Sequence, residues 1–237
     1  MEIISIIFVH YATNKERSSL MRMSIESLIY SLKSLPCELI VIDNGNSLDD
    51  SKYLLRLTQE KKITHYLRNE GNLWFGNARN QGYALCTGEY LCFTDNDILF
   101  EDTWLERCLY ILKHSPRDKV FATPLDIDNA HRQKKYYEEP TIIDGKRHIT
   151  NKFSGSNCWV MKTSDFKLLG GFANHRIAGT KWSQQYERKG YAVISTRQIK
   201  ARHLGLKHTP FVGYNKGIDC PMVKTFTNGQ TLNINSE

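Results

Sequence analysis

The chain has 237 residues, of which 41% are hydrophobic, so it can bury a substantial core, and an α/β chain of this length commonly forms one domain. It carries 32 Lys and Arg against 25 Asp and Glu, a formal net charge of +7, which favours contact with phosphates. The six cysteines form no C-x-x-C pair, which argues against a disulfide framework or a zinc site. The apolar segment "IISIIFV" is too short to span a bilayer, so we expect a cytoplasmic protein.

The first half of the chain alternates strand-like and helix-like patterns. Continuous apolar, β-branched runs predict buried strands over 2–9, 38–42, 63–67, 89–94 and 119–123. Apolar residues at helical spacing predict helices over 16–35 and 102–113, a weaker helix around Leu54 and Leu57, and a short Gly- and Ala-rich helix over 76–86. This alternation predicts an α/β fold with a mostly parallel central sheet flanked by helices.

The second half is less regular. Residues 125–152 are polar and poor in periodicity, which indicates loops or short edge hairpins. Strands are predicted over 154–161 and 191–195, a short helix follows residue 163, and another helix is predicted around 180–189.

In a parallel α/β sheet, ligands bind at the carboxyl ends of the strands. Four groups of polar residues follow the predicted strands at this point: His10-Tyr11, Asp43-Asn44-Gly45, Arg68-Asn69-Glu70-Gly71 and Asp95-Asn96-Asp97. We expect them to gather along one edge. Amides, glycines, an arginine and carboxylates suit a ligand that carries hydroxyls, a base and phosphates bridged by a metal.

The stretch "GEYLCFTDNDILF" runs a buried strand directly into two aspartates. An extended chain would place Asp95 and Asp97 on the same side, with Asn96 turned away. Two carboxylates held so close repel each other unless a positive group lies between them. Their hard oxygen ligands favour Mg²⁺ or Mn²⁺ over zinc, so the sequence predicts a site for one of these metals. Aspartates at a strand end are also common turn residues, and that alternative stays open.

Four segments in this order resemble a known family: "SIIFVHYATNKE", "ELIVIDNGNS", "NEGNLWFGNARNQGYALCTGEYLCFTDND" and "GSNCWVMKTSDFKLLGGF". They are similar to the GT-A nucleotide-sugar glycosyltransferases, in particular glycosyltransferase family 2, over about residues 3–205. The resemblance implies a Rossmann-like GT-A domain over residues 1–237. Its nucleotide-sugar-binding half would be 1–123, its acceptor-binding half 124–205, and its C-terminal lid or tail 206–237.

The resemblance also implies roles for single residues. Asp43 would bind the base of the donor, and Asp95 and Asp97 would form the D-x-D metal and ribose site. His203 would be a further metal ligand. The residues expected at the donor site are His10, Asp43, Asn69, Gly71, Arg79, Asn80, Asp95 and Asn96, and those expected at the metal are Asp95, Asp97 and His203.

The activity implied by the resemblance is metal-dependent transfer of a sugar from a nucleoside diphosphate, with UDP preferred, to a hydroxyl acceptor. Surface polysaccharide or glycoconjugate synthesis would be the setting, with a glycan, lipid-linked or small-molecule acceptor and no nucleic acid as partner. The positive charge is also compatible with peripheral contact at the inner face of the membrane.

The chain departs from the family at the expected general base. Family 2 enzymes usually place an acidic pair between the "GGF" turn and the "GY" strand start, but here no carboxylate lies between Asp165 and Glu187. An inverting reaction needs a base to accept the acceptor's proton. His175 and Asp128 are the candidates, with Asp126 as a further one; a retaining reaction would need no such base, and an inactive donor-binding relative is a third alternative.

Two readings from other classes compete with the transferase. The net positive charge and the aromatic stretches "NLWFGN" and "KKYY" permit a module that binds nucleic acid or an anionic surface, but the basic residues are scattered. A sugar nucleotidyltransferase would share the sheet. It would normally carry a glycine-rich loop after the first strand, and "HYATNKERSS" lacks those glycines.

Overall fold

The computed structural model describes residues 2–32, 35–124, 138–152, 158–174, 178–196, 201–204, 223–225 and 231–233. Within these residues the main sheet has eight strands in the order β3-β2-β1-β4-β10-β6-β11-β9. Their bounds in that order are His65–Arg68, Cys37–Asp43, Ile4–His10, Tyr90–Thr94, Cys158–Lys162, Val120–Thr123, Ala192–Ser195 and Thr150–Asn151.

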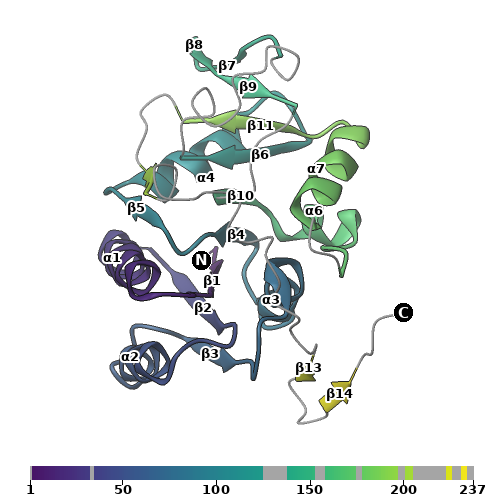
Figure 1. The fold of residues 1–237 in the computed structure, drawn as a ribbon. Coiled ribbons are helices and arrows are strands. Elements are labelled where there is room, and N and C mark those ends of the chain that lie inside the picture. Colours follow the sequence, from purple (N-terminus) through teal and green to yellow (C-terminus); the bar gives the residue numbers. More distant parts are fainter. Residues whose placement is uncertain are drawn as a thin grey trace.

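Helices cover both faces of this sheet. Figure 1 shows α1 and α2 on one side, with α3, α6 and α7 on the other. The helices are α1 (Lys15–Ser31), α2 (Leu48–Gln59), α3 (Trp74–Tyr83), α4 (Trp104–His114), α6 (Thr163–Leu169) and α7 (Ala178–Arg188). Each face therefore has a hydrophobic core of its own.

Successive side chains of strand β1 point to opposite faces of the sheet and so pack in both hydrophobic cores. Ile6 and Phe8 pack in the cluster that contains the apolar residues of α1, α2 and α4. Ile7 packs in the other cluster, with α3, α6 and α7. All three side chains are fully buried, which explains why the sequence of a central strand reads as an uninterrupted apolar run.

The mostly parallel sheet expected from the sequence is confirmed. Strands β1, β2, β3 and β4 pair in parallel, as do β6 and β11. Strand β10 lies between β4 and β6 and is antiparallel to both, and β9 is antiparallel to β11. Because β10 reverses direction between them, β6 runs parallel to β4. The carboxyl ends of β1, β2, β3, β4, β6 and β11 therefore meet at one edge.

The predicted helices and strands correspond to the observed ones to within a few residues at most boundaries. The exception near the site is β5 (Ile98–Phe100), a short strand that the sequence did not predict. It pairs with β12 (Ala201–His203) outside the main sheet. The expected edge hairpin is β7 (Thr141–Ile143) with β8 (Lys146–His148), and β13 (Val223–Thr225) pairs with β14 (Thr231–Asn233).

In the part of the chain that the structure describes, none of the helices combines the length and the apolar character that a membrane span requires.

Candidate active site

The Asp95-Asn96-Asp97 segment is a turn between β4 and β5, not a continuation of the strand. The simple alternation expected from an extended chain is therefore wrong, because the backbone turns at Asn96 and Asp97 before β5 begins. Strand β12 fixes the far end of this turn, since the backbone N–H of Leu204 donates to the carbonyl of Asp97 at 2.7 Å. The same pairing sets residue 203 opposite Ile98 in the β5–β12 ladder.

Asp95 is paired with a buried arginine. The guanidinium of Arg79, on α3, donates to Oδ1 of Asp95 at 2.7 Å. The rings of Phe75, Phe93 and Phe172 surround this guanidinium, with centroids 5.1 to 5.6 Å from its central carbon. Burial lowers the pKa of Arg79, and the neighbouring carboxylate of Asp95 opposes that shift. A cation in this aromatic cage holds one side of the turn in place.

Asp97 lies near a second arginine, which the sequence analysis missed. A terminal nitrogen of Arg17 is 3.6 Å from Oδ2 of Asp97, and the Asp97 side chain is only 7% exposed. Arg17 belongs to the first turn of α1, which starts just beyond the carboxyl end of β1. The edge rule that selected Asp97 could have selected Arg17 as well. Each carboxylate of the turn thus has a cation from a different helix beside it.

Asn96 turns inward rather than away from the site. Its amide donates to Nδ1 of His10 at 2.8 Å and to the carbonyl of Tyr11 at 3.3 Å. Because Nδ1 accepts, Nε2 of His10 carries a proton and faces Oδ2 of Asp50 at 3.4 Å. Fully buried His10 therefore does not point into an open pocket but links the turn to α2.

Asp50 anchors this link. Its Oδ2 also accepts from the hydroxyl of Ser18 at 2.6 Å, and Arg22 lies 3.6 Å from its Oδ1. The hydrogen bond from His10 is the largest cause that lowers the pKa of Asp50 from 3.8 to about 2; burial opposes the shift, and Ser18 and Arg22 add to it. The ionised carboxylate of Asp50 thus connects α2 to α1 and to the end of β1.

Asp43 is fully buried, and its carboxylate is engaged by its own surroundings. Oδ1 accepts from the backbone and side-chain amides of Asn46 at 3.1 and 2.6 Å. Oδ2 accepts from the hydroxyls of Ser51 and Tyr66, and Nε of Arg68 lies 3.5 Å away. The structure thus shows Asp43 organising the loops after β2 and β3, and any contact with a donor base would come in addition to these bonds.

A network of amide side chains joins the loops after β2 and β3 to helix α3. Asn44 donates to Asn72 at 2.8 Å and accepts from Asn69 at 3.0 Å. Asn69 also exchanges two hydrogen bonds with Gln81 on α3. The fully buried amide of Asn69 is therefore part of the scaffold beneath the expected donor site.

Gly71 lies against Gly45. A Cβ added at Gly45 would come within 2.6 Å of two backbone atoms of Gly71, and Gly45 has a φ of +85°. The sequence singled out both glycines for the donor edge, and the structure shows a physical reason for Gly45: the two loops touch through their backbones.

Asn80, expected in the diphosphate pocket, faces another segment. Its side-chain amide donates to the carbonyl of Phe172 at 2.8 Å and accepts from the N–H of the same residue at 3.0 Å. It therefore fastens the "GGF" turn to α3. Arg79 and Asn80 are adjacent in α3 and connect it to two different segments: Arg79 to the aspartate turn, Asn80 to the loop that leads towards residue 175.

Three of the expected site residues cannot be placed with their side chains. Asp128 and His175 lie outside the described residues, and for His203 only the backbone is described. Asp165, the last carboxylate before the missing acidic pair, is no substitute. It accepts from the hydroxyl of Tyr191 at 3.0 Å and follows the end of β10, which pairs with the start of β4 at the opposite edge of the sheet.

The donor atoms at the turn fit a hard divalent cation. Asp95 and Asp97 offer carboxylate oxygens within one three-residue turn, and the backbone of residue 203 lies across the ladder. Among the described residues no group of three His, Cys, Asp or Glu side chains is close enough to hold a metal. Mg²⁺ commonly binds through one or two carboxylates with substrate phosphates completing its shell, and two carboxylates suffice for that arrangement.

The family model described as "Glycosyl transferase family 2" matches residues 6–169. The chain belongs to glycosyl transferase family 2. Among curated proteins, this family member is 32% identical over 111 residues to a putative polypeptide N-acetylgalactosaminyltransferase 13 of Drosophila melanogaster, covering 40% of this chain and 19% of the relative. It is 26% identical over 136 residues to an uncharacterized glycosyltransferase of Methanocaldococcus jannaschii, covering 56% and 47%. The chain thus spans less than half the length of either relative.

Solved structures agree with the family assignment at the level of the fold. A mannosyltransferase from Pyrobaculum calidifontis, solved in complex with GDP-Man and Mn²⁺, superposes with a TM-score of 0.66 at 15% identity, covering 89% of this chain and 59% of that one. Residues 1–349 of S. aureus TarS give a TM-score of 0.62 at 16% identity, covering 85% and 60%. The GT-A fold implied by the sequence resemblance is confirmed for this family 2 member.

Proposed function

We propose that this family 2 member transfers a sugar from a nucleoside diphosphate donor, with UDP preferred, to a hydroxyl acceptor, and that the reaction depends on a divalent metal at the Asp95–Asp97 turn. The observation that carries the proposal is the position of this turn. It lies at the edge where the parallel strands end, and each of its carboxylates has an arginine from a separate helix beside it.

The chemistry of the turn suits a leaving diphosphate. A divalent cation bound there would stabilise the negative charge that builds on the departing phosphate oxygens. Arg79 and Arg17 keep the two carboxylates in place and reduce their mutual repulsion before any metal binds. The structural neighbour with GDP-Man and Mn²⁺ supports a sugar nucleotide and a metal on this fold, while the base and sugar used by this chain are proposals.

Asp43, Asn69 and Asn80 take positioning roles in this proposal. Asp43 and the amide network fix the loops after β2 and β3, where the donor base would lie. Asn80 holds the "GGF" turn, beyond which the acceptor side of the site begins. Rigid loops of this kind keep a donor's reacting carbon in one orientation, which lowers the entropic cost of reaction.

We propose inversion of configuration, with His175 or Asp128 as the base that accepts the acceptor's proton. The test is the anomeric configuration of the product by NMR, read with the rates of His175→Ala and Asp128→Ala. Inversion with a severe loss in one variant would identify the base. Retention, with both variants active, would contradict the general-base proposal and favour a retaining reaction.

The activity itself is tested by donor hydrolysis. A panel of UDP- and GDP-sugars is incubated with the protein in Mn²⁺, in Mg²⁺ and in EDTA, and release of the nucleoside diphosphate is measured. We expect release from at least one donor that EDTA abolishes and added Mn²⁺ restores. Saturable binding of a single-stranded oligonucleotide, with no donor turned over in any metal, would contradict the proposal in favour of a nucleic-acid module.

A further inference from the structure

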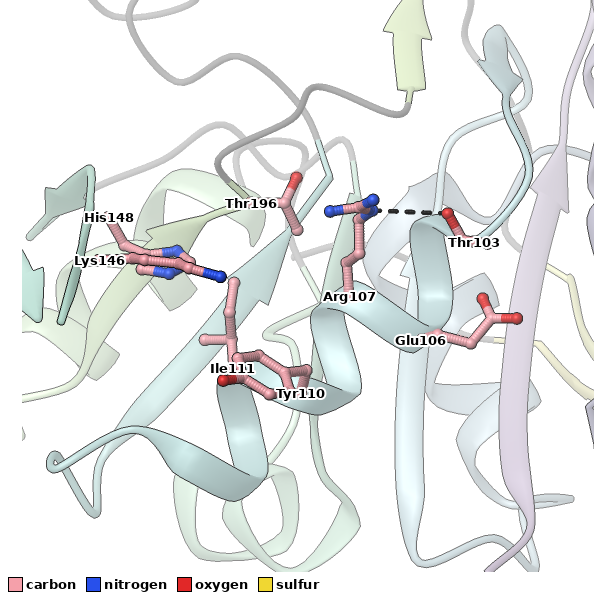
Figure 2. Close-up of a pocket in the computed structure, with 8 residues that line it drawn as sticks. All are labelled: Thr103, Glu106, Arg107, Tyr110, Ile111, Lys146, His148 and Thr196. Carbon is pink, nitrogen blue, oxygen red and sulfur yellow. Dashed lines mark hydrogen bonds between the residues drawn. The ribbon is translucent and has the colours of Figure 1, made fainter. Parts of the chain in front are cut away.

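A pocket of about 420 Å³ opens beside helix α4, and none of its described lining residues belongs to the aspartate turn. Figure 2 shows the residues that line it: Thr103, Glu106, Arg107, Tyr110, Ile111, Lys146, His148 and Thr196. They come from α4 and the residue before it, from β8 of the edge hairpin, and from the residue that follows β11. None of these residues belongs to a motif that the sequence offers for the donor or metal site.

Two cations face this pocket from opposite walls. In Figure 2, Lys146 reaches in from β8, and the guanidinium of Arg107 reaches up from α4, with Thr196 between them. Nε of Arg107 is 3.4 Å from the hydroxyl of Thr103, which accepts. Neither Arg107 nor Lys146 forms an ion pair with a carboxylate of the described chain.

Among the described lining residues the one carboxylate, Glu106, does not neutralise these cations. Figure 2 shows the Glu106 side chain leaving α4 on the side away from Lys146. The charge of Glu106 acts instead on the thiol of Cys37, whose pKa is raised to about 12, chiefly by burial and further by that charge. Counting the residues that the structure describes, the space between Arg107 and Lys146 therefore carries an excess of positive charge.

Two polar residues in the wall are buried. His148 is 7% exposed and Thr196 is 4% exposed. Nδ1 of His148 lies 3.4 Å from the carbonyl of Ser195, so it is the nitrogen that donates there. The N–H of Thr196 donates to the carbonyl of Thr123 at 3.0 Å. This bond joins the carboxyl ends of β6 and β11, the half of the sheet beyond β10.

We propose that this pocket binds an anionic group of the acceptor, a phosphate or a carboxylate, between Arg107 and Lys146. The inference rests on the proposed transferase function and adds the chemical class of its acceptor. Arg107 provides a planar donor pair, Lys146 a mobile ammonium, and Thr196 a hydroxyl in the fixed wall. An acceptor anchored there would extend along the carboxyl edge towards the donor half.

The binding test needs no donor, so its result is independent of the transferase activity. Binding of inorganic phosphate and of glycerol 1-phosphate is measured by calorimetry on the full chain, in Arg107→Gln, Lys146→Gln and the control Lys52→Gln. Lys52 is exposed on α2, so its loss matches the change in net charge. We expect saturable binding that weakens at least about fivefold in each pocket variant and is unchanged in Lys52→Gln. No saturable binding, or equal weakening in all three variants, would overturn the proposal.

A second experiment distinguishes two possible sources of the anion, a lipid headgroup and a soluble glycan. Transfer to neutral sugars, to phosphorylated or uronic-acid acceptors, and to phosphatidylglycerol vesicles is compared, with donor hydrolysis recorded in parallel. The proposal predicts that Arg107→Gln raises the KM of anionic acceptors about fivefold and leaves donor hydrolysis unchanged. A response confined to the vesicles would place the anion in a lipid headgroup, and one confined to soluble acceptors in a free glycan. Equal loss for neutral and anionic acceptors would contradict the proposed specificity.

Discussion

Asp43 holds together two loops of the site. We therefore expect its removal to lower the stability of the fold more than it weakens donor binding. Four hydrogen-bond donors and the guanidinium of Arg68 surround its fully buried carboxylate. Asp43→Ala would leave these buried donors without their acceptor. We expect the free energy of unfolding to fall by about 3 kcal/mol or more, measured by urea denaturation.

The matched control is Asp118→Ala, which removes an exposed aspartate before β6 and should change stability by less than about 0.5 kcal/mol. The base-binding role that the resemblance implies for Asp43 predicts instead that Asp43→Ala weakens UDP binding with little change in stability. If Asp43→Ala proves as stable as Asp118→Ala, the structural role is wrong and the base-binding role gains support.

Asp50 gives a pH prediction. Its pKa is lowered from 3.8 to about 2, chiefly by the hydrogen bond from His10, so its ionised form contributes stability above the unfolded pKa. That contribution is lost as the pH falls through the folded pKa. The free energy of unfolding should therefore drop between about pH 4 and pH 2 in the wild type and less steeply in Asp50→Asn. Identical slopes in both proteins would contradict the shift.

Residue types and strand ends were enough to locate the aspartate turn, but not its contacts. The edge rule selects Asp95 and Asp97, and it would also have selected Arg17, because α1 begins at the same edge. It cannot show that Asn69 faces Gln81 or that Asn80 faces Phe172. Those contacts depend on how the loops close in three dimensions, and the sequence holds no local signal for them.

At the scale of the elements, the loops after β2 and β3 meet through glycine. Gly45 and Gly145 both have positive φ, at +85° and +70°, but an added Cβ at Gly45 would lie 2.6 Å from the backbone of Gly71, whereas at Gly145 nothing lies within 4 Å. Gly145→Ala should therefore cost only the backbone term, about 1 kcal/mol. Gly45→Ala should cost clearly more, because the loop must also move.

Thermal unfolding of the two glycine variants measures that difference directly. The account predicts a lower Tm for Gly45→Ala than for Gly145→Ala, together with weaker donor binding, since the two touching loops form part of the expected donor site. Equal Tm values would mean that the loops can separate at no cost. The close approach would then not be a constraint on the site.

Most elements were predictable because their apolar periodicity is strong, as in β1, where both faces are buried. Strand β5 was not, since "ILF" is only three residues long and its partner β12 lies about a hundred residues further along the chain. The antiparallel direction of β10 could not be predicted from the sequence either. An apolar run buried on both faces reads the same in either direction.

For the whole molecule, the site arises from the topology. Six strands deliver their carboxyl ends to one edge, and helices α1 and α3 each bring one arginine to the aspartate turn there. The described residues that line the proposed anion pocket come from α4 and the residue before it, from β8, and from the residue after β11, a strand that lies beyond β10 in the sheet. This separation lets donor binding and acceptor binding be tested with different variants.

The central claim is that a nucleoside diphosphate binds through a metal held by Asp97. Its most direct test is calorimetric titration of UDP and GDP into the wild type, Asp97→Asn and the control Asp118→Asn, each with Mn²⁺ and with EDTA. The account predicts Mn²⁺-dependent binding in the wild type and in Asp118→Asn, and at least about a tenfold loss in Asp97→Asn. Binding that is equally tight in EDTA, or in Asp97→Asn with Mn²⁺, would contradict it.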